Sequence, residues 1–476
     1  MRRIALAFFR VISPTVVVLC APHSSSRAQT PATGVPAAMT LVQVIETANA
    51  GYPAIKAAEA QQRAAQGEIS VARTAFLPRT DVLWQTNRAT ANNILGLLLP
   101  QSTIPSVTGT VLPADPSRSA WNSAGGALLS WQPFDFGARR AKLESARAGS
   151  EAARRAAMLT SLEVSANAGS AFFDLAAAEQ LVTVAEANVR RYEAFDKAVH
   201  VLFKNSLRPG ADASQADAQL ALARNQLIQL QTQKAIRRSA LFAYLQMKPD
   251  HAEIDAAQLL TSLPATDVES SPATEHPAVL EERAIGLQQQ AQKHFLDRSY
   301  VPVFGASGMI FGRGAGTSST GPSPGGAAGL APDVLNWGAG IQVSFAAFDY
   351  FILRDQRRVQ EAKVEAEAAR YDQSLSDVTA ALEQAHATLA GARSLAANTP
   401  IELAAARESE QQQQVRYRSG LATVVDVAAA EGVLAQAEGD EAIARLGVWR
   451  AELGVAAAQG DLRPLLLMLH NQAKGN

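Results

Sequence analysis

Residues 130–140 read SWQPFDFGARR, and residues 344–354 read SFAAFDYFILR, 214 positions further along the chain. The same offset relates KNSLRPGADASQADAQLALA at 204–223 to RSGLATVVDVAAAEGVLAQA at 418–437. Short matches between Ala-rich segments arise easily, but a fixed offset kept over about a hundred residues indicates an internal repeat. Each half is therefore expected to be one structural unit, and a tandem pair suits a pseudo-symmetric assembly.

The repeat continues upstream of this motif. YPAIKAAEA at 52–60 matches HPAVLEERA at 276–284 with an offset of 224, and Pro78 matches Pro302 in the same way. Because the offset changes only before the 130–140 motif, any difference in length between the halves belongs to a loop there.

Both halves show the same order of predicted elements, which is a helix, two strands, a long helix and a shorter return helix. In the first half these are 40–76, 79–91, 120–132, 135–202 and 212–247, and in the second they are 273–299, 301–313, 335–347, 349–416 and 423–459. Asp135 and Asp349 follow the strand pairs, where each can cap the helix that begins there. Pro400 is expected to kink or break the second long helix.

The first long helix measures roughly 100 Å at 1.5 Å per residue. Its apolar and small residues follow the a/d spacing of a coiled coil, broken once by Asp196. These positions are Leu175, Ala178, Val182, Ala185, Val189, Tyr192 and Val199. Small residues at about half of them allow close helix approach.

The strand expected at 335–347 alternates between two kinds of residue. Trp337, Ile341 and Val343 share one face, whereas Asn336 and Gln342 lie on the other. One apolar and one polar face suit a membrane barrel with lipid outside and water inside, although a buried sandwich strand has the same pattern.

Composition and the N-terminus restrict the class of protein. The chain has 476 residues, 6% aromatic residues and a net charge of −1, which favour long helices and give no basic stripe for nucleic acid. Residues 1–28 are expected to be a signal peptide, followed by a linker at 29–39. Cys20 permits a lipoprotein alternative, but Leu19 stands where a small residue is needed. No later apolar run reaches the about 18–20 residues of a transmembrane helix, so any membrane span is expected to be β.

The sequence carries no pattern that predicts catalysis, a cofactor or a metal. The seven histidines include no pair at i,i+3 or i,i+4, and no Cys/His/Asp cluster with ligand spacing is evident. Nucleophile-elbow and P-loop motifs are also missing from the sequence. We therefore expect neither an enzyme nor a cofactor-binding protein.

The expected fold is mainly α with a small transmembrane β-barrel, built from a duplicated helix–strand pair–long helix hairpin unit. Four strands per chain are too few to close a barrel, so a trimer with twelve strands and a helical tunnel is expected. The domains are a first repeat at 40–250, a connection at 251–272, a second repeat at 273–460 and a C-terminal tail at 461–476.

These features together resemble the TolC-like outer membrane efflux family. The resemblance rests on SWQPFDFGARRAKLESARA and SFAAFDYFILRDQRRVQEAKVEA, and on the hairpin tips RPGADASQADAQLALARNQL and RYRSGLATVVDVAAAEGVL, and it covers about residues 40–460. It implies a homotrimeric channel that spans the outer membrane lipid and the periplasm. The implied partners are a periplasmic adaptor protein and an inner membrane transporter, in tripartite efflux or type I secretion.

The resemblance also implies a narrow periplasmic mouth lined by aspartates. Asp426 matches the first aperture aspartate, and Asp212 is its counterpart in the first half. Tyr417 matches the turn tyrosine, and Arg416 and Arg418 are possible gate or tip residues. A second family aspartate is Ala429 here, and a family arginine is Ala422. A ring of three carboxylates favours cations, but Asp426 can instead serve only to cap the return helix.

Two other classes remain as alternatives. An exported periplasmic coiled-coil adaptor or scaffold protein also uses long helices. An adaptor is expected to have one hairpin between lipoyl-like and barrel strands, whereas this chain has two hairpins with strand pairs at equivalent places. A scaffold has no need of the alternating strand at 335–347.

Overall fold

The computed structural model describes residues 38–90, 119–206, 209–248, 252–264, 271–317 and 325–475. The expected signal peptide at 1–28, Cys20 and most of the 29–39 linker lie outside these residues. The elements of the first half are α1 (Leu41–Gly51), α2 (Pro53–Thr74), β1 (Arg79–Thr90), β2 (Ser119–Phe134), α3 (Ala138–Lys204) and α4 (Gly210–Leu245). After α5 (Ala257–Thr261) and the short 3₁₀ helix η2 (Ala273–Glu275) come α6 (Pro277–Asp297), β3 (Val303–Ala315), β4 (Val334–Ser344), α7 (Asp349–Arg418), α8 (Val424–Gln459) and α9 (Arg463–Gly475).

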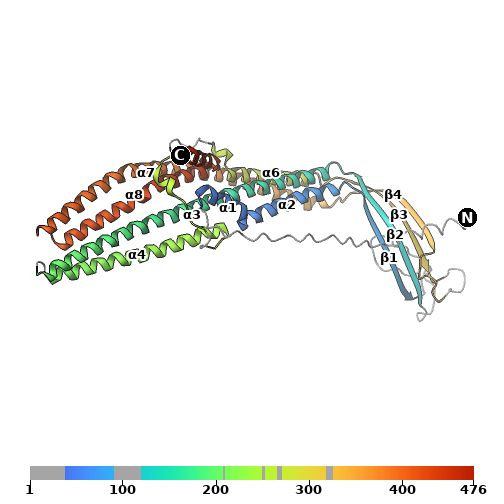
Figure 1. Cartoon of the computed structure of the whole chain (residues 1–476). Helices are drawn as coiled ribbons and strands as arrows, with labels where there is room; N and C mark the ends of the chain where they lie inside the picture. The colour runs from blue at the N-terminus through green and yellow to red at the C-terminus, as the bar shows by residue number, and fades with distance from the viewer. Residues whose placement is uncertain are drawn as a thin grey trace. The chain divides into compact units, whose positions relative to one another are not determined.

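The duplicated unit predicted from the sequence is present. In each half a helix leads to two strands, and the second strand leads within a few residues into a helix of 67 or 70 residues. All eight strand ends lie within three residues of the expected ones. The fold class, mainly helical with a small sheet, is thus confirmed (Figure 1).

The start of α3 depends on the FDFG sequence of the repeated motif. Gly137 has φ 92°, a left-handed conformation that glycine adopts without strain. Asp135 Oδ2 accepts hydrogen bonds from the backbone N–H of Arg139 at 2.7 Å and from its side chain at 2.8 Å. The Asp135 carboxylate therefore accepts a hydrogen bond from the first turn of α3, as expected of a capping residue, although Gly137 occupies the N-cap position. Asp349 is instead the first residue of α7, and Phe348 is the N-cap.

The four strands form one antiparallel sheet in the order β1-β2-β3-β4. The register places Val82 opposite Ala127, Ala127 opposite Ile310, and Ile310 opposite Trp337. Because residues directly opposite each other share a face, apolar side chains from all four strands lie on one side of the sheet. The other side is mixed, because the polar side chains of Gln85, Asn122 and Gln342 lie there together with a small apolar cluster. This cluster contains Leu83, Ala124, Met309 and Phe311.

The long helices form two antiparallel hairpins, α3 with α4 and α7 with α8 (Figure 1). All seven a/d residues predicted for α3 are buried, which confirms the coiled-coil seam. Pro400 lies inside α7, and the expectation that it breaks this helix is wrong. The neighbouring residues explain why. Thr399 is buried, and Leu403 packs against Leu434 of α8, so tertiary contacts hold the helix across the lost hydrogen bond.

The main apolar core lies where α1, α3, α4, α8 and α9 meet, around Phe172, Leu241 and Trp449. The single helix expected at 40–76 is two helices, because Pro53 begins α2 and Tyr52 is extended. Residues 461–476, expected only as a tail, contain α9, whose Leu465 is fully buried. No helix within the described part of the chain is both long and apolar enough to cross a membrane.

Candidate functional site

The ends of the two hairpins meet in one apolar cluster. It contains Val199 of α3, Ala213 and Ala216 of α4, Tyr417 of α7, and Val424 and Val427 of α8, together with Ala422. Tyr417 is 3% exposed, and its ring lies 5.4 Å from that of Phe195. This turn tyrosine therefore packs the two hairpins together, and the family arginine position is occupied by a buried alanine in the same cluster.

Asp426 lies on the surface in the first turn of α8. Its Oδ2 accepts hydrogen bonds from the backbone N–H and the hydroxyl of Thr423, both at 2.8 Å, and the Thr423 hydroxyl accepts from the Asp426 N–H at 3.2 Å. The two residues thus form a capping box. The hydrogen bonds from Thr423, and then the charge of Arg416, lower the pKa of Asp426, so the carboxylate is ionised at neutral pH.

Asp212 occupies the equivalent place in α4 but has a different environment. Its N-cap residue is Pro209, which has neither a backbone N–H nor a hydroxyl to donate. A capping box of the Thr423–Asp426 kind therefore cannot form, and Asp212 is half-buried rather than exposed. The structure brings both predicted aperture aspartates to the hairpin ends, but only Asp426 is held by its own helix cap.

Arg416 and Arg418 are exposed in the last turn of α7. The turn after them passes through Gly420 at φ 76° and is closed by a 2.8 Å hydrogen bond from the Leu421 N–H to the Arg416 carbonyl. Ala429, where some family members have an aspartate, is exposed one turn after Asp426. Opposite charges of Arg416 and Asp426 therefore lie near each other at the end of the second hairpin.

A polar junction between the hairpins was not predicted from the sequence. Arg191 of α3 donates to Glu431 Oε2 at 3.0 Å and to Glu438 Oε2 at 2.9 Å, both in α8. One residue further, the Tyr192 hydroxyl donates to the Ala428 carbonyl at 3.1 Å. These contacts join residues about 240 positions apart, so no local pattern in the sequence could have paired them.

Glu431 has the most unusual charge environment of this junction. Its side chain is 1% exposed, and burial, followed by repulsion from Glu410, raises its pKa to about 7. Arg191 and a hydrogen bond from Gln414 at 3.3 Å act in the opposite direction. The junction therefore contains a carboxyl group that gains or loses its proton near neutral pH.

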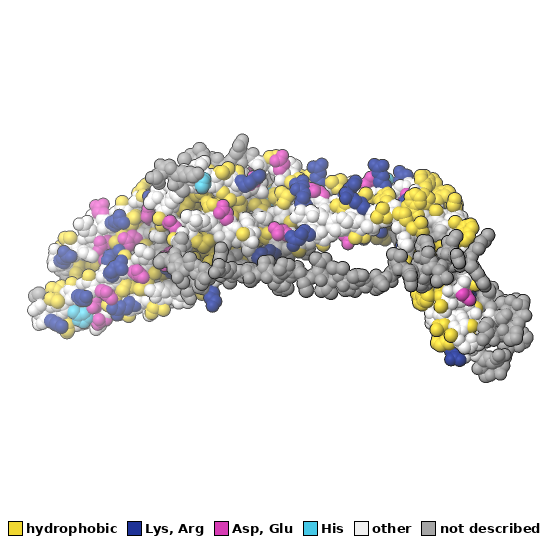
Figure 2. All heavy atoms as spheres, turned by 45° about the vertical axis from the view of Figure 1, so that its right-hand side comes forward, with side chains coloured by type: hydrophobic (Ala, Val, Ile, Leu, Met, Phe, Trp, Pro, Cys, Tyr) yellow, Lys and Arg dark blue, Asp and Glu magenta, His cyan; other side chains and the backbone are white. Residues whose placement is uncertain are grey.

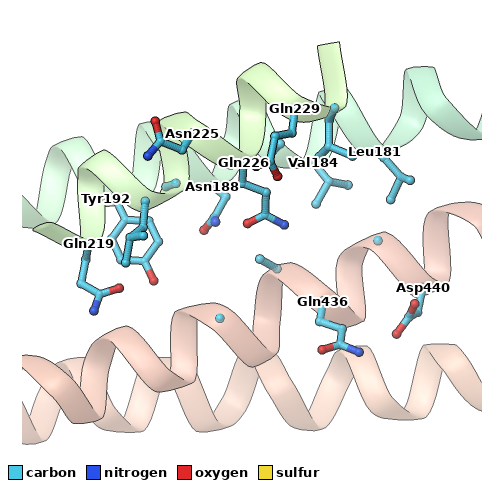
Figure 3. Close-up of a pocket in the computed structure, with 17 residues that line it drawn as sticks. Leu181, Val184, Asn188, Tyr192, Gln219, Asn225, Gln226, Gln229, Gln436 and Asp440 are labelled. Carbon is cyan, nitrogen blue, oxygen red and sulfur yellow. The ribbon is translucent and has the colours of Figure 1, made fainter. Parts of the chain in front are cut away.

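A groove of about 750 Å³ lies between the hairpins beside this junction. Figure 3 shows that α3, α4 and α8 contribute its walls, with amide side chains directed toward the space between them. Its polar lining includes Asn188, Gln219, Gln226, Gln229 and Gln436. Asp440 of α8 adds a carboxyl group to this lining, so the groove is polar along much of its length.

A second group of titratable side chains lies within the first hairpin. His200 Nε2 is 3.1 Å from Asp217 Oδ1 and 3.6 Å from Asp196 Oδ1. The sequence alone does not predict this group, because its members form neither a pair of histidines nor a cluster that is compact in sequence. Asp196 and His200 are one turn apart in α3, whereas Asp217 comes from α4. Asp196 was visible only as the residue that breaks the a/d pattern.

The chain was compared with protein families, curated proteins and solved structures. It is similar in structure to the outer-membrane channel OprN (20% identity, TM-score 0.69, 88% of this chain and 89% of that one). It is also similar to the CmeC outer membrane channel of Campylobacter jejuni (15%, 0.72, 88% and 85%) and to the outer membrane protein VceC of Vibrio cholerae (18%, 0.69, 88% and 96%). A comparison with curated protein sequences found no match.

The family model described as outer membrane efflux protein matches residues 44–245 and 277–461, one segment in each repeat. This match confirms the resemblance inferred from the twin motifs, and with it an outer membrane location and a transport role rather than an enzymatic one. It does not agree with the alternatives of a periplasmic adaptor or scaffold. Because both repeats are matched over most of their length, the chain belongs to the outer membrane efflux protein family.

Proposed function

We propose that three copies of this chain form an exit duct, through which small molecules or ions pass from the periplasm to the outside. The observation that carries the proposal is the exposed apolar face of the sheet. Trp337, Ile341, Val82 and Trp84 are between 60% and 84% exposed, and Figure 2 shows hydrophobic side chains gathered over the strands. Such a surface needs an apolar partner, and the lipid of the outer membrane supplies one.

The number of strands supports a trimer. Among the strands that the structure describes, β1 pairs with β2 alone and β4 with β3 alone, so this sheet has two unpaired edges. Open edges invite pairing with further strands, and closure into a barrel removes them. Three copies would bring twelve strands, within the range of membrane barrels, and would turn the more polar face, with Gln85, Asn122 and Gln342, toward a water-filled lumen.

Aromatic side chains support a membrane boundary at the junction of sheet and helices. Tyr300 packs against Phe345 in a tilted arrangement with ring centroids 5.0 Å apart and against Tyr350 at 5.8 Å, and Phe348 is 86% exposed. Exposed aromatic rings with polar tips favour the interface between lipid and water. The helices that begin here would then extend roughly 100 Å into the periplasm.

The hairpin ends would form the periplasmic mouth. In a trimer, Asp426 appears three times, and ionised carboxylates around an axis favour cations over anions. Asp212 would add a second set, with Tyr417 holding the hairpins in place and Arg416 and Arg418 near the rim. Leu421 and Val425 are 71% and 57% exposed at this end, which suits docking to a periplasmic adaptor and an inner membrane transporter in tripartite efflux or type I secretion.

Electron microscopy of the detergent-extracted protein tests the assembly. We expect a three-fold particle with a short barrel and a helical tunnel of roughly 100 Å. Conductance across a planar bilayer then tests whether the particle is a channel. A monomeric particle would contradict the duct. So would a trimer that shows no conductance at any voltage, even after the contacts between its tip residues have been removed.

A further inference from the structure

The seam of the first hairpin contains a carboxylate where an apolar residue is expected. Tyr192 and Val199 occupy neighbouring seam positions of α3 and are 6% and 0% exposed, and Asp196 lies between them. Its Oδ1 atom is buried and receives no hydrogen bond from the described residues. A buried carboxylate oxygen that accepts no hydrogen bond is unfavourable, so a cation or a hydrogen-bond donor beside this atom would stabilise it.

The groups that face Asp196 come from both helices of the hairpin. His200 lies one helical turn further along α3, and Asp217 faces both from α4. One ligand atom from each residue lies within 4.8 Å of the other two. The guanidinium of Arg224 also acts electrostatically on Asp196, but it is paired with Glu193 at 2.7 Å.

We propose that Asp196, His200 and Asp217 bind a divalent transition-metal cation such as Zn²⁺, which clasps α3 to α4 near the end of the hairpin. One imidazole and two carboxylates are ligands that Zn²⁺ accepts at about 2.0–2.2 Å. Tetrahedral binding at these lengths separates ligand atoms by about 3.3 Å. The two distances from His200 Nε2, 3.1 and 3.6 Å, already approach that value.

Access to the site is open on one side. His200 and Asp217 are 36% and 61% exposed in their side chains, whereas Asp196 is 17% exposed. A cation can therefore enter from water and keep a water ligand in its remaining position. Its positive charge would compensate the two carboxylates and give the buried Asp196 oxygen a partner.

The second hairpin provides an internal comparison. At the offset of 214 residues, Asp196, His200 and Asp217 correspond to Glu410, Gln414 and Glu431. There the Gln414 amide donates to both carboxylates, and Arg191 from the other hairpin supplies a positive charge. An amide is a poor ligand for Zn²⁺, so the second cluster compensates its charge with protein groups, whereas the first has a metal-binding imidazole.

The test is zinc binding to the full chain in detergent, after removal of any histidine tag. Equilibrium dialysis against Zn²⁺ should give one tightly bound ion per chain in the original protein. His200→Gln, which copies the side chain of Gln414, should weaken binding by at least about tenfold, and Asp217→Asn should do the same. His386→Gln is the matched control, because His386 is an exposed helix residue of α7 and should leave binding unchanged.

A second measurement separates loss of the site from loss of the fold. Zn²⁺ should raise the thermal midpoint of the original protein and of His386→Gln, but not of His200→Gln, whose midpoint without metal should match that of the original protein. Equal zinc binding by His200→Gln and the original protein would overturn the proposal. So would a loss of binding in His386→Gln of the same size, which would mark adventitious binding to surface histidines.

Discussion

Replacing Glu431 with glutamine tests which effect controls the junction between the hairpins. Two effects compete at this residue. Burial and repulsion from Glu410 favour the neutral acid, whereas Arg191 at 3.0 Å favours the carboxylate. If burial dominates, the pKa of about 7 lies above the ordinary value of 4.5. Between these two values the folded junction binds more protons than the unfolded chain.

The sign of the pH dependence follows from this proton difference. Stability rises with pH only where the unfolded state binds more protons, so here it must fall as pH rises through the window from 4.5 to about 7. The full displacement corresponds to a ceiling of about 3 kcal/mol, and most of this loss falls between pH 5 and pH 8. Glutamine does not titrate, so Glu431→Gln should remove this loss.

Amide hydrogen exchange in the first turns of α8 measures the effect locally. Comparing the two proteins at the same pH cancels the intrinsic pH dependence of exchange. We expect near-equal protection at pH 5 and about 70-fold higher protection of Glu431→Gln at pH 8. Glu438→Gln is the matched control, since Glu438 binds the same Arg191 but is 19% exposed. A protection ratio that stays constant from pH 5 to pH 8, or reverses, would show that Arg191 outweighs burial.

Three further changes test other parts of the molecule. Asp426→Ala should reduce the cation preference of the channel in bilayers and, because it removes half of the capping box with Thr423, slightly lower the stability of α8; an unchanged reversal potential would contradict the aperture role. Ile341→Arg, on the apolar face of the sheet, should impair membrane assembly by about 2–4 kcal/mol, whereas Gln342→Arg on the opposite face should be tolerated, as fractionation of the two variants would show. Pro400→Ala should restore a hydrogen bond within α7 and raise the thermal midpoint, and a lower midpoint would mean that the proline is needed for the shape of this helix.

Much of the fold could be predicted because its determinants are local. The offset of 214 residues, the alternation at 335–347 and the a/d pattern of α3 each depend on residues close in sequence. Helix α9 was missed because Leu465 and Leu469 are buried only by packing against the main core. The break before Pro53 was missed because the helical pattern continues on both sides of it.

The site was less predictable because its contacts join distant parts of the chain. The sequence and the family resemblance placed Asp212, Tyr417 and Asp426 at the hairpin ends, where the structure has them. The sequence could not predict that Tyr417 would be buried, nor that Arg191 would reach Glu431 across 240 positions. Such contacts depend on how the two hairpins pack against each other, and this packing is determined by all four long helices together rather than by any local stretch of sequence.

The repeat also explains why the two hairpin ends differ in chemistry while sharing a framework. At matched positions the first hairpin has aspartates, whose short side chains keep Asp196 and Asp217 within their own hairpin. The second has glutamates, and the longer Glu431 reaches Arg191 of the first. Pro209 and Thr423 differ in the same way, since only threonine can close a capping box. The two repeats thus differ in that the second hairpin makes charged contacts with its neighbour, whereas Asp196, His200 and Asp217 contact one another within the first. A change of charge at Glu431 in α8 should therefore alter the contact between the two hairpins. A change of charge at Asp217 in α4 should instead act within the first hairpin.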